Sequence, residues 1–367
     1  GNVLRITDVR VLSYFLGNLD RPYHNSILTT TTKQITFVEV LTDEGVSGLS
    51  FASNSERQSI EGPIKARIVG ESPIDAARLW HRMFTGWRKP VAKGDAISAI
   101  GAVDNALWDL RGKVLNLPVY RLLGGFRDRV PAYAAGGYYE EGKGIEGLAE
   151  EMARFVAAGY RAVKMKVGGA PLTEDVARVR AARDAVGPDV KLMVDANNAW
   201  NAAEAIAFGR AVEPFSVAWF EEPCWPDDLR GAAEVCRALD VPVASGEIEY
   251  TRWGCRDLIE QGAADIIQAD PHTGGGLTEW IRIAALASAH HLPVAPHGNH
   301  YIGAHAVAAV DNGMIVESYA RLQAWQDEFF TPMELEDGEL ILPQTPGLGI
   351  GVDLRLLEGA ARDKALV

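Results

Sequence analysis

The feature that most constrains the fold is a repeat of short β-rich segments that alternate with helical segments from about residue 130 onward. Each repeat is roughly 20–30 residues long, and this alternation is typical of parallel strands joined by helical crossovers. Eight such segments match the strands of a closed β/α barrel. They are VPAYAAGG (130–137), AVKMKVG (162–168), KLMVDAN (191–197), AWFEEP (218–223), PVASGE (242–247), DIIQAD (265–270), PVAPHG (293–298) and MIVESY (314–319).

A doubly wound open sheet is the structural alternative to a barrel. Such a sheet would place a glycine-rich phosphate turn after its first strand and would confine the ligand to one crevice. Here polar residues end almost every predicted strand. Because barrel enzymes carry their functional side chains at these carboxyl ends, the pattern favours a modified (β/α)8 barrel of the α/β class.

The N-terminal part follows a different order, with strands first and helices afterwards, which indicates a separate α+β domain. Strands are predicted at 3–16 and 35–52, a long polar loop at 17–34 and the strongest helix at 97–117. The tail at 338–353 reads as strands that return to the N-terminal domain. The expected division is a capping domain over 1–125, a barrel over 126–330 and a C-terminal segment over 331–367.

Three carboxylates, Asp195, Glu221 and Glu247, each end one β–α unit of the predicted barrel. Carboxylates that converge on one barrel mouth repel each other unless a cation lies between them. Oxygen ligands on rigid strands suit a hard ion, Mg²⁺ before Mn²⁺. A salt bridge to a neighbouring loop is the alternative for each acid taken singly, and the regular spacing of all three favours a metal site.

Two sets of polar side chains are candidate bases. Lys164 and Lys166 lie two positions apart in one strand and so face the same side, and their mutual repulsion is expected to lower one lysine pKa toward neutrality. Asp270 and His297 end consecutive strands, so Asp270 can hold the His297 imidazole in one tautomer. Glu317, if its surroundings keep it neutral, could donate a hydrogen bond to an oxyanion; the alternative is an ordinary salt bridge.

Charge and cysteine content exclude several classes of partner. A net charge of -13 and a pI near 5.2 argue against binding to nucleic acid or an anionic membrane. Apolar runs stay short of the roughly 18 residues that span a bilayer, and no signal-peptide pattern is recognised. The three cysteines lack metal-type spacing, so we expect reduced thiols in a cytoplasmic protein.

Several motifs together resemble the enolase superfamily, mandelate racemase subgroup. They recur in order over essentially the whole chain, which makes chance a poor explanation. The branches that lactonise muconate or epimerise dipeptides are less similar, because they carry a lysine after the sixth strand and this chain has none between Lys191 and Lys364. The motifs are NALWDLRGKVLNLPVYRLLGG (105–125), KMK (164–166), VDANNAW (194–200), FEEP (220–223), SGE (245–247), ADPHTGGG (269–276) and APHG (295–298).

The resemblance implies an N-terminal α+β capping domain over a (β/α)7β barrel, bound Mg²⁺, removal of the proton α to a carboxylate to give an enediolate, and a homo-oligomer. It also implies a role for individual residues. The implied metal ligands are Asp195, Glu221 and Glu247; the acid/base groups are Lys166 and His297 with Asp270; Lys164 contacts the substrate carboxylate, Glu317 is electrophilic and Asn197 is a polar residue of the site.

The expected activity is dehydration of an acid sugar to a 2-keto-3-deoxy acid, catalysed by a hydro-lyase. Racemisation of an α-hydroxy acid such as mandelate is the first alternative, and a non-catalytic barrel scaffold is a remote one. The expected partner is a small carboxylate. Besides Lys164, Asn197 and Glu317, the residues expected to contact it are Tyr138, at a strand end, and His24, in the polar segment 17–34.

Overall fold

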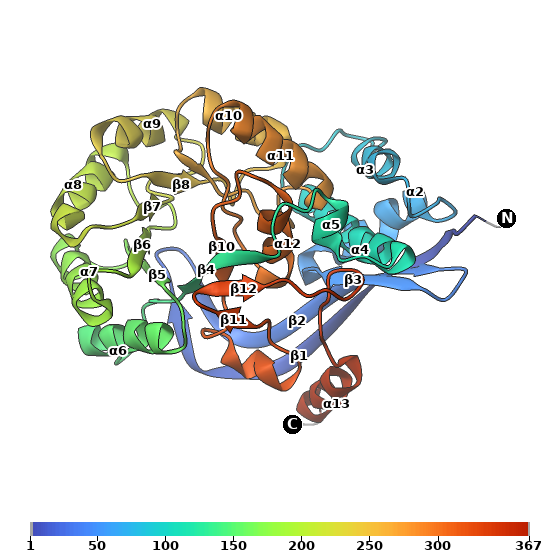
Figure 1. The fold of residues 1–367 in the computed structure, drawn as a ribbon, viewed down its shortest axis with the longest axis horizontal. Helices are drawn as coiled ribbons and strands as arrows, with labels where there is room; N and C mark the ends of the chain where they lie inside the picture. The colour runs from blue at the N-terminus through green and yellow to red at the C-terminus, as the bar shows by residue number, and fades with distance from the viewer. Residues whose placement is uncertain (1–2, 366–367) are drawn as a thin grey trace.

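The computed structural model describes residues 3–365, which form an antiparallel sheet with helices and a larger barrel sheet (Figure 1). The antiparallel sheet has the order β1 (Ile6–His24), β2 (Thr29–Thr42) and β3 (Ser47–Phe51). Its apolar face packs on α4 (Asp95–Leu115). α4 is buried along most of its length because it contacts both this sheet and the barrel part, to which Asp104 and Asn105 are hydrogen-bonded.

The long loop predicted at 17–34 is wrong. The segment is a two-stranded ribbon, since β1 and β2 continue to the turn at 25–28 with register shifts after Phe15 and Asn18. β3 pairs only with the stretch of β2 from Phe37 to Leu41, so the outer ribbon has little core to pack against and is mostly exposed. Without a buried face there is no apolar alternation, and its polar composition resembles that of a loop.

The remaining elements of the N-terminal part are short. They lie beside α4. These elements are η1 (Asn54–Glu56), α1 (Arg57–Ser59), the π-helical turn η2 (Ile60–Ile64), α2 (Lys65–Ile68) and α3 (Ala76–Phe84). Trp80 of α3 donates its indole N–H to the barrel carbonyl of Gly275 at 2.8 Å, and Asn105 of α4 itself donates to the carbonyl of Pro271 at 3.1 Å.

The second sheet forms the predicted barrel, with a ring of helices outside it (Figure 1). Its parallel strands are β4 (Arg129–Ala135), β5 (Ala162–Lys166), β6 (Lys191–Asp195), β7 (Trp219–Glu221), β8 (Val243–Ser245), β9 (Ile266–Ile267) and β10 (Val316–Ser318), and β10 closes the barrel on β4. The helices of this part are α5 (Val119–Leu122), α6 (Gly144–Ala157), α7 (Leu172–Val186), α8 (Ala202–Val212), η3 (Glu213–Phe215), α9 (Leu229–Ala238), α10 (Thr251–Glu260), α11 (Leu277–Ala289) and α12 (His300–Ala309).

The segment predicted as the seventh barrel strand, 293–298, contributes single bridges instead of a full strand. Val294 bridges Ile267 on one side and Gly313 on the other, both in parallel. The segment therefore occupies the place of a strand between β9 and β10. It carries His297 at the same end of the barrel as the other strand ends.

The C-terminal strands pair with the barrel sheet and not with the N-terminal sheet. The chain after them does return to the N-terminal part, as predicted, since the backbone N–H of Leu348 donates to Asp109 of α4 at 2.7 Å. β11 (Leu335–Glu336) and β12 (Glu339–Ile341) form a hairpin, and β12 pairs antiparallel with β4. After η4 (Ala324–Glu328), contact with the N-terminal sheet comes from Ile350 and Val352 and from the last helix, α13 (Leu354–Ala365). Leu357 of α13 is buried with Leu16 and Phe37 of β1 and β2.

Two apolar layers lie on the two faces of the barrel strands. Val163, Met165 and Leu192 pack outward against the helices, whereas Met193 and Trp219 fill the barrel interior. None of the helices between residues 3 and 365 has both the length and the apolar character required to cross a membrane.

Candidate active site

Strand register brings the predicted site residues into line at one end of the barrel. Lys166 of β5 pairs with Asp195 of β6, which pairs in turn with Glu221 of β7. Residues paired in this way on parallel strands point to the same face. Because Val163 and Met165 point outward, Lys164 and Lys166 point into the barrel, as the alternation predicted.

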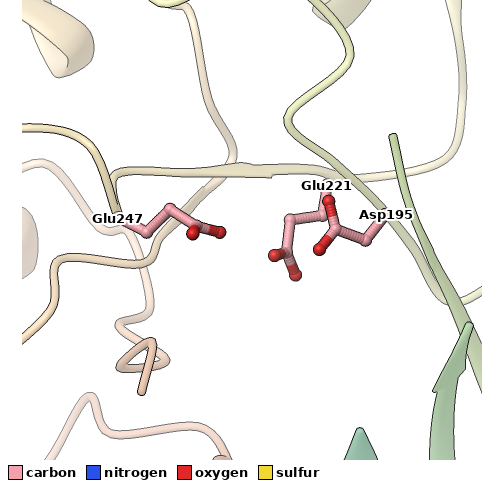
Figure 2. A group of neighbouring side chains, drawn as sticks. All are labelled: Asp195, Glu221 and Glu247. Carbon is pink, nitrogen blue, oxygen red and sulfur yellow. The ribbon is translucent and has the colours of Figure 1, made fainter. Parts of the chain in front are cut away.

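The three predicted metal ligands lie together. Asp195, Glu221 and Glu247 each offer a carboxylate oxygen, and these oxygens lie within 4.8 Å of one another. Figure 2 shows the Asp195 and Glu221 carboxylates side by side, with Glu247 extending toward them from the opposite side. Among the described residues, Oε2 of Glu221 and Oε1 of Glu247 are buried without a hydrogen-bond partner. Unpaired buried carboxylate oxygens in one space fit a hard divalent cation.

Burial and mutual repulsion control the charge of this group. Burial raises the pKa of Glu221 well above its ordinary value, and the adjacent Asp195 raises it further. Burial opposes the ionisation of Asp195 too, yet Lys166 and Lys164 hold the pKa of Asp195 below its ordinary value. A nearby positive charge would therefore stabilise the ionised forms of these three carboxylates.

The predicted lowering of a lysine pKa is wrong for this structure. Lys164 Nζ lies 2.7 Å from Oε1 of Glu221 and 2.7 Å from Oε2 of Glu317, and Lys166 Nζ lies 2.6 Å from Oδ2 of Asp195. Burial alone would lower both lysine pKa values, but the carboxylates outweigh it and raise them. A divalent cation bound to the same carboxylates would weaken the attraction that holds these lysines protonated.

The predicted pair of Asp270 and His297 is formed. Nδ1 of His297 lies 2.7 Å from Oδ2 of Asp270, and Oδ1 of Asp270 accepts the backbone N–H of His272 at 2.7 Å. Nε2 of His297 lies 3.1 Å from Oε2 of Glu247. Burial disfavours the imidazolium, but Glu247, Glu317 and Asp270 raise the His297 pKa well above its ordinary value.

Glu317 is a hydrogen-bond acceptor in a salt bridge, which is the alternative to the neutral donor considered from the sequence. Its carboxylate accepts from Lys164 Nζ at 2.7 Å, from the backbone N–H of Gly298 at 2.9 Å and from the hydroxyl of Tyr319 at 2.9 Å. Burial opposes the ionisation of Glu317, but Lys164 and His297 lower its pKa below the ordinary value. Hydrogen bonds from three donors stabilise the charged form of the Glu317 carboxylate.

Asn197 and Tyr138, two of the residues predicted to contact substrate, border the same space. The backbone N–H of Asn197 donates to Oδ1 of Asp195 at 2.9 Å, and within the described residues its own Oδ1 is buried and unpartnered. The Tyr138 ring centre lies 4.9 Å from Lys166 Nζ. Both side chains therefore adjoin the carboxylate and lysine groups.

His24 is placed differently. Its ring stacks on Tyr139, with the centroids 5.3 Å apart, and the Tyr139 hydroxyl binds Asp175 instead of a site residue. The tip of the ribbon does reach the barrel mouth, because Ser26 Oγ donates to the carbonyl of Ala196 at 2.7 Å. A contact between His24 and substrate stays a prediction.

Sequence reasoning missed three residues that bind the site groups. Gln268 Nε2 donates to Oε1 of Glu221 at 3.0 Å, and Lys164 Nζ donates to the Tyr133 hydroxyl at 3.1 Å. The third is Tyr319. A signal was present in the sequence, because Gln268 lies two positions before Asp270 and Tyr319 two positions after Glu317, so strand alternation places each on the face of its neighbour.

A barrel with this carboxylate cluster, flanked by a lysine and a histidine, defines the class of enolase-type barrel enzymes that act on carboxylates. The chain belongs to the mandelate racemase / muconate lactonizing enzyme family within that class. Residues 8–124 match the N-terminal domain of that family, and residues 147–356 match its enolase C-terminal domain-like part.

Relatives with assigned activities are similar over most of their length. Arabinonate dehydratase of Saccharolobus solfataricus is 36% identical over 86% of this chain and 87% of its own. L-talarate/galactarate dehydratase of Salmonella typhimurium is 32% identical over 88% of this chain and 83% of its own. The crystal structure of a racemase from Streptomyces coelicolor with bound magnesium has a TM-score of 0.89 and 31% identity, covering 97% of this chain and 99% of that one.

Proposed function

We propose that this protein is a Mg²⁺-dependent hydro-lyase that dehydrates an acid sugar to a 2-keto-3-deoxy acid. The observation that carries the proposal is that the two candidate acid/base groups contact different carboxylates of the proposed metal site. Lys166 contacts Asp195 at 2.6 Å, whereas Nε2 of His297 contacts Glu247 at 3.1 Å. A substrate held at the cluster would therefore have one of these groups on each side.

Asp195, Glu221 and Glu247 are the residues that would hold the cation. Bound Mg²⁺ supplies positive charge that stabilises the negative charge developing on the substrate carboxylate. Lys164 is proposed to act on that carboxylate through its positive charge, since its three N–H donors already bind Tyr133, Glu221 and Glu317. Asn197 and Tyr138 complete the proposed contacts with substrate, and His24 is retained as a further one on the capping ribbon.

The proposed reaction needs one base and one acid. Lys166 in its neutral form accepts the proton from the α-carbon, and the electron pair of the broken C–H bond passes to the carboxylate as an enediolate. His297 in its charged form donates the Nε2 proton to the β-hydroxyl, which leaves as water with the electrons of the broken C–O bond. Asp270 keeps the proton on Nδ1 throughout. The resulting enol tautomerises to the keto acid.

Dehydration is favoured over racemisation because several relatives with assigned activities are acid-sugar dehydratases, although two others are sugar-acid cycloisomerases. Racemisation of an α-hydroxy acid remains the second candidate, since it shares the enediolate and a structural neighbour is described as a racemase. A scaffold without activity is disfavoured, because the lysines, the dyad and the carboxylate cluster are all present and in contact.

The wider assignments are proposals as well. We propose a homo-oligomer that resides in the cytoplasm and binds neither nucleic acid nor membrane, in line with the net charge of -13. We also propose the division into a capping domain (1–125), a barrel domain (126–330) and a C-terminal segment (331–367).

The test is a substrate panel assayed with the Mg²⁺-loaded enzyme. We expect one of arabinonate, L-talarate, galactarate and further mono- and diacid sugars to yield a keto acid detectable with semicarbazide. Mandelate should show no appreciable loss of optical rotation. Efficient racemisation of mandelate, together with an inert acid-sugar panel, would replace the dehydratase assignment with the racemase.

A further inference from the structure

The Tyr319 hydroxyl joins two groups of the proposed mechanism. It donates to Oε1 of Glu317 at 2.9 Å and lies 3.3 Å from Nε2 of His297. Tyr319 follows β10 directly and lies two positions after Glu317, so it faces the barrel mouth. This hydroxyl therefore touches both the fixed carboxylate and the nitrogen that is proposed to deliver a proton.

The direction of these hydrogen bonds follows from the partners of Glu317. An ionised carboxylate only accepts hydrogen bonds, and Glu317 already accepts from Gly298 and Lys164. The Tyr319 proton is thus directed to Glu317, which leaves its oxygen lone pairs facing His297. Because Nδ1 of His297 binds Asp270, the proton of the imidazolium that can move is the one on Nε2.

Among the described residues, two carboxylates also face Nε2 of His297: Oε2 of Glu247 at 3.1 Å and, beyond hydrogen-bond distance, Oε1 of Glu317 at 3.7 Å. Glu247 belongs to the metal cluster, and a carboxylate that holds a cation attracts an imidazolium less. The Tyr319 oxygen then remains as a hydrogen-bond acceptor for the Nε2–H of His297. Tyr319 is also neutral, since burial raises the pKa of its hydroxyl well above the ordinary value.

We propose that Tyr319 is a positioning residue for the leaving-group step, an inference that rests on the proposed dehydration. Oriented by Glu317, its oxygen holds the Nε2–H of His297 toward the barrel axis until the β-hydroxyl takes the proton. The contact is long enough, at 3.3 Å, for a substrate hydroxyl to share or replace it. Removal of the α-proton by Lys166 does not involve Tyr319.

Because Tyr319 is proposed to act only in the leaving-group step, its removal should change the ratio between loss of the β-hydroxyl and return of a proton to the α-carbon. Without the Tyr319 hydroxyl the C–O bond breaks more slowly, while α-proton removal continues. The enediolate then takes a proton back from Lys166, whose ammonium group carries three exchangeable protons. In D₂O this return places deuterium on the α-carbon of unreacted substrate, which a general loss of structure would not do.

The experiment compares Tyr319→Phe with Tyr160→Phe in the Mg²⁺-loaded enzyme, on the acid sugar of the panel that turns over fastest. Tyr160 is a matched control, because its hydroxyl lies 2.7 Å from Oγ of Ser318. Ser318 is in β10, beside Glu317, but points to the opposite face of the strand. We expect Tyr319→Phe to lower kcat about 10- to 100-fold, with KM little changed, and to add α-deuterium to recovered substrate seen by NMR. Tyr160→Phe should do neither.

The possible failures are distinguishable. If the unaltered enzyme dehydrates the substrate and Tyr319→Phe matches Tyr160→Phe in kcat and exchange, the inference is overturned and the proposed function stands. An equal loss of dehydration and exchange in Tyr319→Phe also overturns it, whether or not its melting temperature has fallen. An unaltered enzyme that dehydrates no acid sugar removes the proposed function, and the inference with it.

Discussion

Nδ1 of His297 lies 2.7 Å from Oδ2 of Asp270, although 27 positions separate the two residues in the chain. The contact arises because the two residues follow neighbouring positions of the barrel, β9 and the bridge at Val294. It fixes the ring so that Nε2 faces the metal cluster. The imidazole is thereby held in one orientation, as the proposed proton transfer requires.

Replacement of Lys166 and replacement of His297 should impair different steps of the reaction. We expect His297→Asn and Lys166→Ala each to lower kcat by about 10²–10⁴-fold, the usual scale of acid–base catalysis. Because Lys166 is the proposed α-proton base, His297→Asn should retain exchange of the α-proton in D₂O and Lys166→Ala should lose it. Proton NMR of recovered substrate makes the distinction. Full dehydratase activity in His297→Asn would exclude this residue as a catalyst.

Replacement of a metal ligand should weaken magnesium binding selectively. Glu221 lies in the carboxylate cluster, whereas its sequence neighbour Glu222 does not supply a ligand atom. We expect Glu221→Gln to lower Mg²⁺ affinity at least about tenfold, because a neutral amide replaces a charged ligand. Isothermal titration with MgCl₂ measures this. Glu222 adjoins Glu247, so Glu222→Gln is the comparison and should lower the affinity less than Glu221→Gln does. The reverse order would mean that the strand register is misassigned.

Lys164 should matter for stability as well as for activity. Its ammonium group is 2.7 Å from both Glu221 and Glu317, and all three side chains are at most 1% exposed. Lys164→Met leaves two buried carboxylates without their cation, which costs on the order of 3–5 kcal/mol in the free energy of unfolding.

Chemical denaturation without metal measures this cost. The control is Lys65→Met, which removes an exposed contact with Asp8 and should change stability by at most about 1 kcal/mol. If Lys164→Met and Lys65→Met proved equally stable, the buried charge network would not be a source of stability.

The pH dependence of stability should reveal an ion pair between the capping part and the barrel. Nε2 of His272 lies 2.8 Å from Oε2 of Glu56, which also accepts from Ser98. Burial opposes both charges, yet His272 lowers the pKa of Glu56 below 4.5, and Glu56 and Asp270 raise the pKa of His272 above 6.5.

The sign of the effect follows from these directions. Glu56 contributes stability above its unfolded pKa near 4.5 and loses it as the pH falls through the lower folded value. His272 contributes below its unfolded pKa near 6.5 and loses it as the pH rises through the higher folded value. The pair is therefore strongest between these two values.

Glu56→Gln should accordingly destabilise the protein by about 1–2 kcal/mol near pH 5.5, and by less near pH 9. Thermal unfolding across this range measures the difference from the unaltered protein. Glu358→Gln, which removes an exposed pair with Arg362, should give a difference that changes little with pH. A Glu56→Gln difference that stays constant from pH 5.5 to pH 9 would show that the pair is not charged.

Local sequence was sufficient for the parts of the site that depend on strand alternation and strand order. Lys164 and Lys166 face inward because alternate residues of β5 share a face, and Asp195 and Glu221 meet because strand ends converge at one mouth. Gln268 and Tyr319 could have been found by the same rule, since each lies two positions from a predicted site residue.

What only the tertiary structure decided is the state of charge and the path of the chain where no core constrains it. The pKa of Lys166 is raised where a lowering was predicted, and Glu317 forms the salt bridge that was its alternative. Both depend on which opposite charges lie within a few ångströms, and those come from other strands. The ribbon at 17–34 is a hairpin without a core to give it an apolar pattern, and the pairing of β12 with β4 joins backbone partners distant in sequence. Alternation along one strand specifies a face, but Coulomb energies and sheet pairing depend on distances that arise only when the segments pack together.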